Sequence, residues 1–144
     1  MRILHIITGL KDGGAENVLY KICKHDSKNK HIVISIISLK NSKKIYSLIN
    51  QLGVKIYSFD LKFYSIFKFF SLVYLIRSLK PDVVQTWLAH SDFIGGIASR
   101  FAGINRVVWN VRYSKLERGV VSSRTLFLIK ILTVLSYSIP KIII

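Results

Sequence analysis

The sequence predicts an α/β fold in which one parallel sheet carries helices on both faces. Short, nearly continuous apolar runs rich in Ile and Val alternate with longer segments in which apolar residues recur at helical spacing. Strands that are apolar along their whole length are typical of parallel sheets buried on both sides. The sequence contains no internal repeat and no linker, so we expect a single domain over residues 1–144.

Three strands and two helices are expected in the first half of the chain. The opening run RILHIIT is apolar and β-branched, which is typical of a buried strand. In the second helix the apolar residues form one stripe that ends at Gly53, a suitable C-cap. The expected order is strand 2–8, helix 14–25, strand 31–39, helix 42–53 and strand 54–61.

The second half continues this alternation. A long helical pattern stops before Pro81. Asp92 is expected to cap the next helix or to lie in its first turn, rather than to act as a base, and Gly103 is expected to close that helix. Its small residues permit close packing: Gly95, Gly96, Ala98 and Ser99. The expected order is helix 65–80, strand 81–89, helix 92–103, strand 106–112, helix 123–137 and the start of a sixth strand at 141–144.

Composition limits the classes of partner. Lys and Arg number 22 against 7 Asp and Glu, and the formal net charge of +15 favours anionic partners such as nucleic acid, anionic lipid or phosphorylated small molecules. Nucleic acid is disfavoured because the sequence has no stacking motif and no basic recognition helix. Cys23 is the only cysteine, which excludes an intramolecular disulfide and fits a reducing compartment.

Two apolar stretches bear on location. Residues 3–8 are too short for the apolar part of a secretory signal, so we expect the chain in the cytoplasm. Residues 126–144 are strongly apolar, but Lys130 interrupts them and Pro140 cuts them near the end. A membrane-spanning helix needs about 20 mainly apolar residues. We therefore favour a buried helix followed by a buried strand over a membrane span.

The loop GLKDGG places Gly13 and Gly14 where a strand gives way to a helix. Such glycines expose backbone N–H groups at the positive end of the helix dipole and let a diphosphate approach the backbone. The alternative is a tight turn without a ligand. The loop matches neither G-x-G-x-x-G nor G-x-x-x-x-G-K-[ST], which disfavours nicotinamide and P-loop chemistry.

Ligands of open parallel sheets bind at the carboxyl ends of the strands, where the strand order reverses. His90 has such a position, and its imidazole suits a hydrogen bond to a sugar hydroxyl or polarisation of the reacting groups. The alternative is a surface or capping histidine. Arg112 ends the fifth strand, where a guanidinium would clamp a phosphate or form a surface ion pair, and Lys115 and Arg118 continue this basic loop. The loops of interest are 9–14, 39–42, 61–64, 88–92 and 112–122.

Other histidines and the tryptophans are expected to be structural. Trp87 and Trp109 lie in predicted strands and are interpreted as core residues rather than sugar-stacking platforms. His5 also lies in a strand and is expected to be a core histidine with satisfied hydrogen bonds. His25 and His31 are expected to be solvated.

The helix at 65–80 has two interpretations. Its aromatic and aliphatic residues cover more than one face, whereas a core helix needs only a narrower stripe. An interfacial helix that binds anionic lipid is therefore an alternative to a fully buried one. The basic residues around it are Lys62, Lys68, Arg77 and Lys80.

Two blocks of the sequence resemble family-4 glycosyltransferases of the GT-B architecture, which has two Rossmann-like domains. The blocks are GLKDGGAENVLYKI near the N-terminus and KPDVVQTWLAHSDFIGGIASRFAGINRVVWNVRYS at 80–114. The resemblance implies a Rossmann-like, acceptor-side N-terminal domain. The implied reaction transfers a sugar from a nucleotide-diphosphate sugar, with retention at the anomeric carbon. The implied acceptor is a polysaccharide, lipopolysaccharide or lipid-linked glycan at the inner face of the cytoplasmic membrane.

The resemblance also implies roles for particular residues. Gly13 and Gly14 would face the donor diphosphate, and Glu16 would lie in the first turn of the following helix. With Arg112, these residues form the expected donor-binding set, and His90 is the catalytic candidate in the cleft between two domains. No metal ion and no cofactor is expected, because the nucleotide sugar is a substrate.

The sequence departs from the family pattern because it stops at Ile144, before a donor-binding domain with its paired-glutamate motif. We therefore expect little or no transferase activity from the chain alone, with the donor domain supplied in cis or in trans. Two alternatives remain open. One is a non-catalytic binding or membrane-docking subunit that partners a separate donor-binding chain. The other is an unrelated Rossmann-like nucleotide-binding protein.

Overall fold

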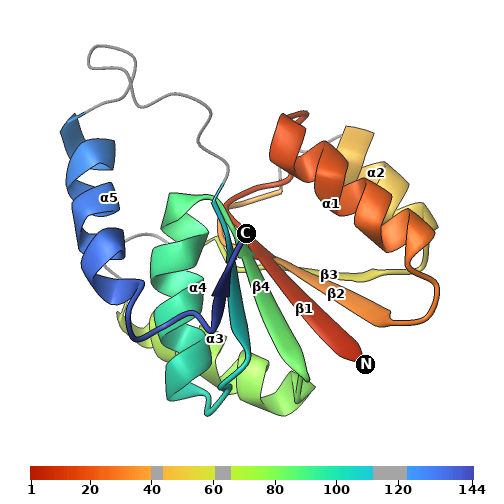
Figure 1. Cartoon of the computed structure of the whole chain (residues 1–144). Coiled ribbons are helices and arrows are strands. Elements are labelled where there is room, and N and C mark those ends of the chain that lie inside the picture. Colours follow the sequence, from red (N-terminus) through yellow and green to blue (C-terminus); the bar gives the residue numbers. More distant parts are fainter. Residues whose placement is uncertain (40–43, 61–65, 112–122) are drawn as a thin grey trace.

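The computed structural model describes residues 1–39, 44–60, 66–111 and 123–144, apart from the side chains of 123–125. In these residues, strands and helices alternate and six parallel strands form one sheet in the order β3-β2-β1-β4-β5-β6 (Figure 1). The predicted α/β, Rossmann-like class is confirmed. The elements are β1 Arg2–Ile7, α1 Gly14–His25, β2 Lys30–Ser35, α2 Lys44–Gln51, β3 Lys55–Ser58, α3 Ile66–Leu79, β4 Val83–Trp87, α4 Ala89–Phe101, β5 Val107–Asn110, α5 Ser123–Leu135 and β6 Ile142–Ile143.

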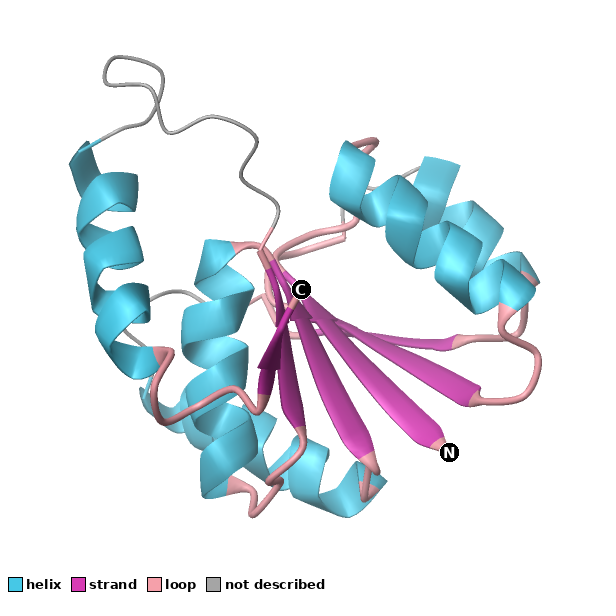
Figure 2. Cartoon of the chain, viewed as in Figure 1, coloured by secondary structure: helices cyan, strands magenta, loops and turns pink. Residues whose placement is uncertain are grey.

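Helices cover both faces of the sheet, as predicted. α1 and α2 lie on one face, and α3, α4 and α5 lie on the other (Figure 2). Because successive residues of a strand point to opposite faces, Ile6 of β1 packs in the core under α3 and α4 while Ile7 packs under α1 and α2. Trp87 and Trp109 are 0% and 2% exposed, which confirms that both belong to the core.

The small residues of α4 allow it to lie very close to the sheet. A Cβ added at Gly95 would stand 2.9 Å from Cγ2 of Ile6, and one added at Gly96 would stand 2.9 Å from Nε1 of Trp109. Larger side chains would push the helix away from the strands, and overpacking of this kind costs about 1–3 kcal/mol. The predicted close packing of this helix is therefore confirmed.

The largest difference from the predicted boundaries is the start of α4. The helix begins at Ala89 rather than at 92, so His90 lies inside its first turn and not in a loop. Leu88, just before it, takes φ 73 and ψ 151, a backbone conformation that residues with a Cβ rarely adopt. This conformation turns the chain from β4 directly into the helix.

The final apolar stretch forms a helix and a strand, but neither is buried as predicted, since Phe127 and Val134 of α5 are 66% and 71% exposed. Ile142 and Ile143 are 55% and 51% exposed, because β6 is the edge strand and pairs only with β5 in the described sheet. Among the helices of the described residues, none has the length and apolar character that would let it cross a membrane.

A directed chain of hydrogen bonds crosses the sheet beneath α1. Nε1 of Trp87 lies 3.3 Å from Nδ1 of His5, and Nε2 of His5 lies 3.0 Å from Nδ1 of His31. Because an indole can only donate, His5 must carry its proton on Nε2 and donate it to His31. Nε2 of His31 then donates to the backbone oxygen of Asp26 at 3.1 Å. His5 is thus a satisfied core histidine, and burial lowers its pKa to about 3.

The prediction that His31 is solvated is wrong, whereas His25 is exposed as predicted. His31 is 7% exposed because it is the second residue of β2, next to buried β1 and the end of α1. The sequence pattern missed this pairing, because it joins residues that lie in different strands.

Cys23 stands beside the same two imidazoles. One ligand atom from each of His5, Cys23 and His31 lies within 4.8 Å of the others, so the trio has the side chains of a metal site. The two histidine rings, however, are arranged for a hydrogen bond to each other. The ring planes are 15° apart and the centroids 5.2 Å apart, so the two nitrogens point at each other. An ion bound at about 2.0–2.1 Å from each nitrogen would require both rings to turn.

Candidate functional site

The two central strands define the place where a ligand would bind. β1 and β4 are neighbours, yet the helices that follow them lie on opposite faces of the sheet (Figure 1). Ligands of open parallel sheets bind at such a reversal of strand order. The segments 9–14 and 88–92 leave the sheet on either side of this point. The hydroxyl of Thr8, immediately before the first segment, and that of Ser91 in the second form a 3.0 Å hydrogen bond.

The two glycines of the loop before α1 have different environments. Gly13 is the N-cap and has an extended backbone with φ −112 and ψ 174. A Cβ at Gly13 would meet the Glu16 carboxylate, so a larger residue there would make the Glu16 side chain swing aside. A Cβ at Gly14 would meet nothing within 4 Å. Gly14 is therefore the glycine whose backbone is open to an approaching molecule.

Glu16 folds back over the start of α1 and is only 8% exposed. A carboxylate at this end of a helix is stabilised by the helix dipole and by the N–H groups that have no partner within the helix. The same negative charge occupies part of the space in which a donor diphosphate was predicted. An incoming anion would therefore have to approach from the side of Gly14 or displace the Glu16 carboxylate.

The first turn of α4 holds the second group of polar side chains. His90 is half-buried at the second position of the helix, and Ser91 makes the bond to Thr8. Leu88 stores backbone strain of about 1–3 kcal/mol at the entry to this turn. Such strain is common where a functional side chain has to be held in place.

Asp92 is a buried carboxyl group in the same turn. It is 1% exposed, its Oδ1 accepts a 2.5 Å hydrogen bond from Thr86, and its Oδ2 has no hydrogen-bond partner. Burial raises its pKa to about 7, although the Thr86 hydroxyl opposes that shift. The predicted place in the first turn is confirmed. The predicted cap role is wrong, because Leu88 is the N-cap and the carboxyl bonds to β4 instead.

The structure brings four of the predicted site residues to one edge of the sheet: Gly13, Gly14, Glu16 and His90. Arg112 lies outside the described residues, as do Lys115 and Arg118. Sequence reasoning missed the burial of Asp92 and the strain at Leu88. The sequence held one signal for the burial of Asp92: Thr86 in β4 stands six residues before it and donates to its carboxyl group.

The chain matches the model of the glycosyl transferase 4-like family over residues 11–144. It therefore belongs to this family, in agreement with the resemblance of its two sequence blocks. No curated protein matches the sequence.

Solved structures with the same fold include glycosyltransferases. Anabaena Alr3699/HepE in complex with UDP and glucose is 20% identical with a TM-score of 0.75, and the match covers 99% of this chain and 37% of that one. Acinetobacter baumannii MurG is 15% identical with a TM-score of 0.64, covering 99% and 40%. The lipopolysaccharide outer core galactosyltransferase WaaB, in its apo form, is 15% identical with a TM-score of 0.52, covering 76% and 32%. The chain thus spans well under half of each of these proteins.

The pH dependence of stability tests the environment of Asp92. Its pKa is about 7 in the folded protein against 3.8 for the free group, so the unfolded chain releases this proton at lower pH. The contribution of this group to the free energy of unfolding is full below about pH 4 and is lost as pH rises through about pH 7. We expect the loss to reach about 4 kcal/mol, at 1.36 kcal/mol per pKa unit. It would be measured by urea unfolding.

Asp92→Asn is the variant for this experiment, because the amide oxygen still accepts from Thr86 and the side chain does not ionise. Its stability relative to the parent should rise between about pH 4 and about pH 8. If the two stability curves run parallel over this range, Asp92 titrates at its ordinary pKa and the assignment is wrong.

Proposed function

We propose that this chain is the acceptor-side part of a retaining glycosyltransferase, which moves a sugar from a nucleotide-diphosphate sugar to a polysaccharide, lipopolysaccharide or lipid-linked acceptor. The observation that carries the proposal is the open backbone at Gly14, beside the first turn of α4, at the reversal of strand order in a member of this family. The complex of HepE with UDP and glucose and the galactosyltransferase activity named for WaaB support a nucleotide sugar as donor.

Each residue then has a physical role. Gly14 lets the donor diphosphate reach the N–H groups at the start of α1, and Gly13 makes room for the Glu16 side chain. His90 hydrogen-bonds a sugar hydroxyl or the reacting groups from the first turn of α4. Arg112 binds a phosphate through its guanidinium. The proposal includes no metal ion and no cofactor.

A donor-binding part completes this site, either in the same polypeptide or in a partner chain. Catalysis in a cleft depends on closure of its two sides, so we expect the chain to be inactive without that part. The alternative is a non-catalytic subunit that binds or docks and leaves the chemistry to another chain. In both cases the chain works in the cytoplasm.

Replacement of His90 tests its catalytic role. In the protein purified from its own cells, we expect His90→Ala to lower the rate of sugar transfer by about 10²-fold or more, the range for a positioned acid–base group. His25→Ala removes an exposed imidazole at the end of α1 and should transfer at the parental rate. A parental rate for His90→Ala would contradict the role. Failure of the parent to transfer any sugar would favour the non-catalytic subunit.

We also propose that α3 docks the chain on the inner face of the cytoplasmic membrane. Only Leu72 and Ile76 of this helix are fully buried, and Phe69, Val73, Leu75 and Leu79 pack against the same core while partly exposed. Phe67 and Tyr74 are 83% and 76% exposed, and Arg77 is exposed beside them. Exposed aromatic residues with basic neighbours are typical of helices that lie in the lipid interface.

Vesicle binding tests this surface. We expect the chain to bind vesicles that contain phosphatidylglycerol and to bind them less as salt increases, because ions screen the attraction. Phe67→Ser should weaken binding by about tenfold or more, since burial of a phenylalanine contributes about 1.5–3 kcal/mol. Phe127→Ser, an exposed phenylalanine on α5, is the matched control. Binding that responds neither to salt nor to Phe67→Ser would exclude α3 as the docking surface.

A further inference from the structure

Thr8 lies where the chain leaves β1, on the side of the sheet that α4 covers. Leu4 and Ile6 pack in the core under α3 and α4, and side chains alternate along a strand, so Thr8 points to the same side. Its Oγ1 lies 3.0 Å from Oγ of Ser91 in the first turn of α4. Ser91 is fully buried, whereas Thr8 is half-buried. The bonded pair therefore has one member that solvent does not reach and one that is partly open.

The direction of this hydrogen bond follows from the surroundings of Ser91. A hydroxyl has one proton to donate, and a buried donor that lacks an acceptor is costly. Within the described part of the chain, the Thr8 oxygen is the only acceptor that the Ser91 hydroxyl has. Because Ser91 is 0% exposed, solvent offers no alternative acceptor. Ser91 therefore donates, and Thr8 accepts.

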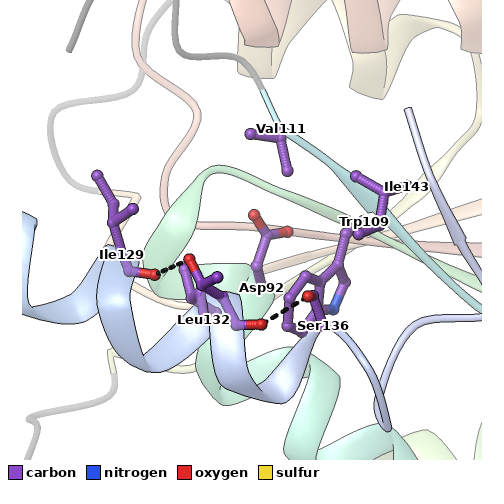
Figure 3. A pocket seen from close by; sticks show the side chains of 8 residues that line it. Asp92, Trp109, Val111, Ile129, Leu132, Ser136 and Ile143 are labelled. Atoms are coloured by element: carbon purple, nitrogen blue, oxygen red, sulfur yellow. Dashed lines mark hydrogen bonds between the residues drawn. The ribbon is translucent and has the colours of Figure 1, made fainter.

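Asp92, the next residue of α4, takes neither of the two hydroxyl protons. Its side chain lines a cavity of about 320 Å³ beside α5, together with Trp109 (Figure 3). Its Oδ1 accepts from Thr86, and its Oδ2 has no hydrogen-bond partner. Among the residues that the structure describes, the Thr8 proton is thus left without an acceptor. It is available to a ligand oxygen.

The position of this proton distinguishes the two ends of a nucleotide-sugar donor. Thr8 follows β1 at the reversal of strand order, and its partner Ser91 is adjacent to His90 in α4. Gly14 begins α1, which covers the opposite face of the sheet. A donor with its diphosphate at Gly14 would cross the edge of the sheet and bring its sugar to the side of Thr8 and His90.

We propose that Thr8 binds the sugar of the nucleotide-sugar donor, donating its proton to a sugar oxygen while it accepts from Ser91. The inference rests on the proposed function and adds a sugar-binding residue to that site. A sugar hydroxyl suits this position, because it accepts the Thr8 proton and keeps its own proton for another acceptor. The hydrogen bond from Ser91 fixes the Thr8 oxygen against the first turn of α4, so the contact is held in place before the sugar arrives.

Calorimetric affinities for UDP-glucose and UDP test this role in the protein purified from its own cells. Both probes carry the diphosphate, and only UDP-glucose carries a sugar. Thr8→Val keeps the branched shape of the side chain and removes its hydroxyl. We expect this variant to bind UDP-glucose about fivefold more weakly than the parent, the effect of losing roughly one hydrogen bond. Its affinity for UDP should remain that of the parent.

Further variants separate a direct contact from an effect on packing. Ser91→Ala breaks the same hydrogen bond but leaves the Thr8 hydroxyl, so it should weaken UDP-glucose binding clearly less than Thr8→Val does. Thr8→Ser retains the hydroxyl and should bind UDP-glucose as the parent does. Thr8→Ala removes the hydroxyl without adding a methyl group and should match Thr8→Val. Thr133→Val, the same substitution at an exposed threonine of α5, is the matched control and should leave both affinities unchanged.

Four outcomes would overturn the inference. Parental UDP-glucose affinity in both Thr8→Val and Thr8→Ala would mean that Thr8 does not touch the sugar, and the proposed function would stand as long as UDP still binds. Equal weakening by Thr8→Val and Ser91→Ala would mean that the bond only holds the first turn of α4. Equal loss of UDP and UDP-glucose affinity in Thr8→Val would assign Thr8 to the diphosphate instead. Failure of the parent to bind either probe would contradict the proposed function as well.

Discussion

The close approach of α4 to the sheet is the constraint on which the rest of the site depends. Gly95 and Gly96 have no side chains, so Ile6 and the indole of Trp109 fill the space against the helix backbone. A helix held this close fixes the position of its first turn, and that turn carries His90 and Asp92. Thr8 ties the same turn to the segment that leads into α1. The glycine loop and the α4 turn are therefore held together by packing and by one hydroxyl bond.

Burial has opposite consequences for the polar groups on the two sides of the sheet. Under α1, the buried histidines satisfy each other in one directed chain, so they strengthen the core without remaining available for chemistry. Beside α5, Asp92 and Trp109 are just as deeply buried but leave two polar atoms unpaired. A satisfied network rigidifies a fold, whereas each unpaired buried polar atom costs about 1–3 kcal/mol.

Much of the fold could be predicted from local sequence patterns. α1 was placed at its observed bounds, and the sheet class followed from the alternation of apolar runs and helical stripes. The burial of His31 could not be predicted in this way, because its partner lies in another strand and the pairing register is a tertiary property.

The candidate site could be predicted only in part, again because its geometry depends on tertiary contacts. Gly13 and Gly14 stand out in the sequence, but only the structure shows that Gly13 makes room for Glu16 while Gly14 is open. Leu88 carries no sequence signal for a positive φ, so the early start of α4 and the inward turn of Asp92 could not be predicted. The roles of Gly14, Glu16, His90 and Arg112 remain predictions that depend on the ligand.

The central claim is that the backbone at Gly14 receives the diphosphate of a nucleotide sugar. It is tested most directly by the affinity of the protein, purified from its own cells, for UDP-glucose and UDP, comparing Gly14→Val with Lys21→Val, an exposed position farther along α1. A β-branched side chain at Gly14 should weaken binding of both by about tenfold or more through loss of close approach. Lys21→Val should bind as the parent does. If Gly14→Val binds as tightly as the parent, the diphosphate does not lie at this loop and the account is wrong.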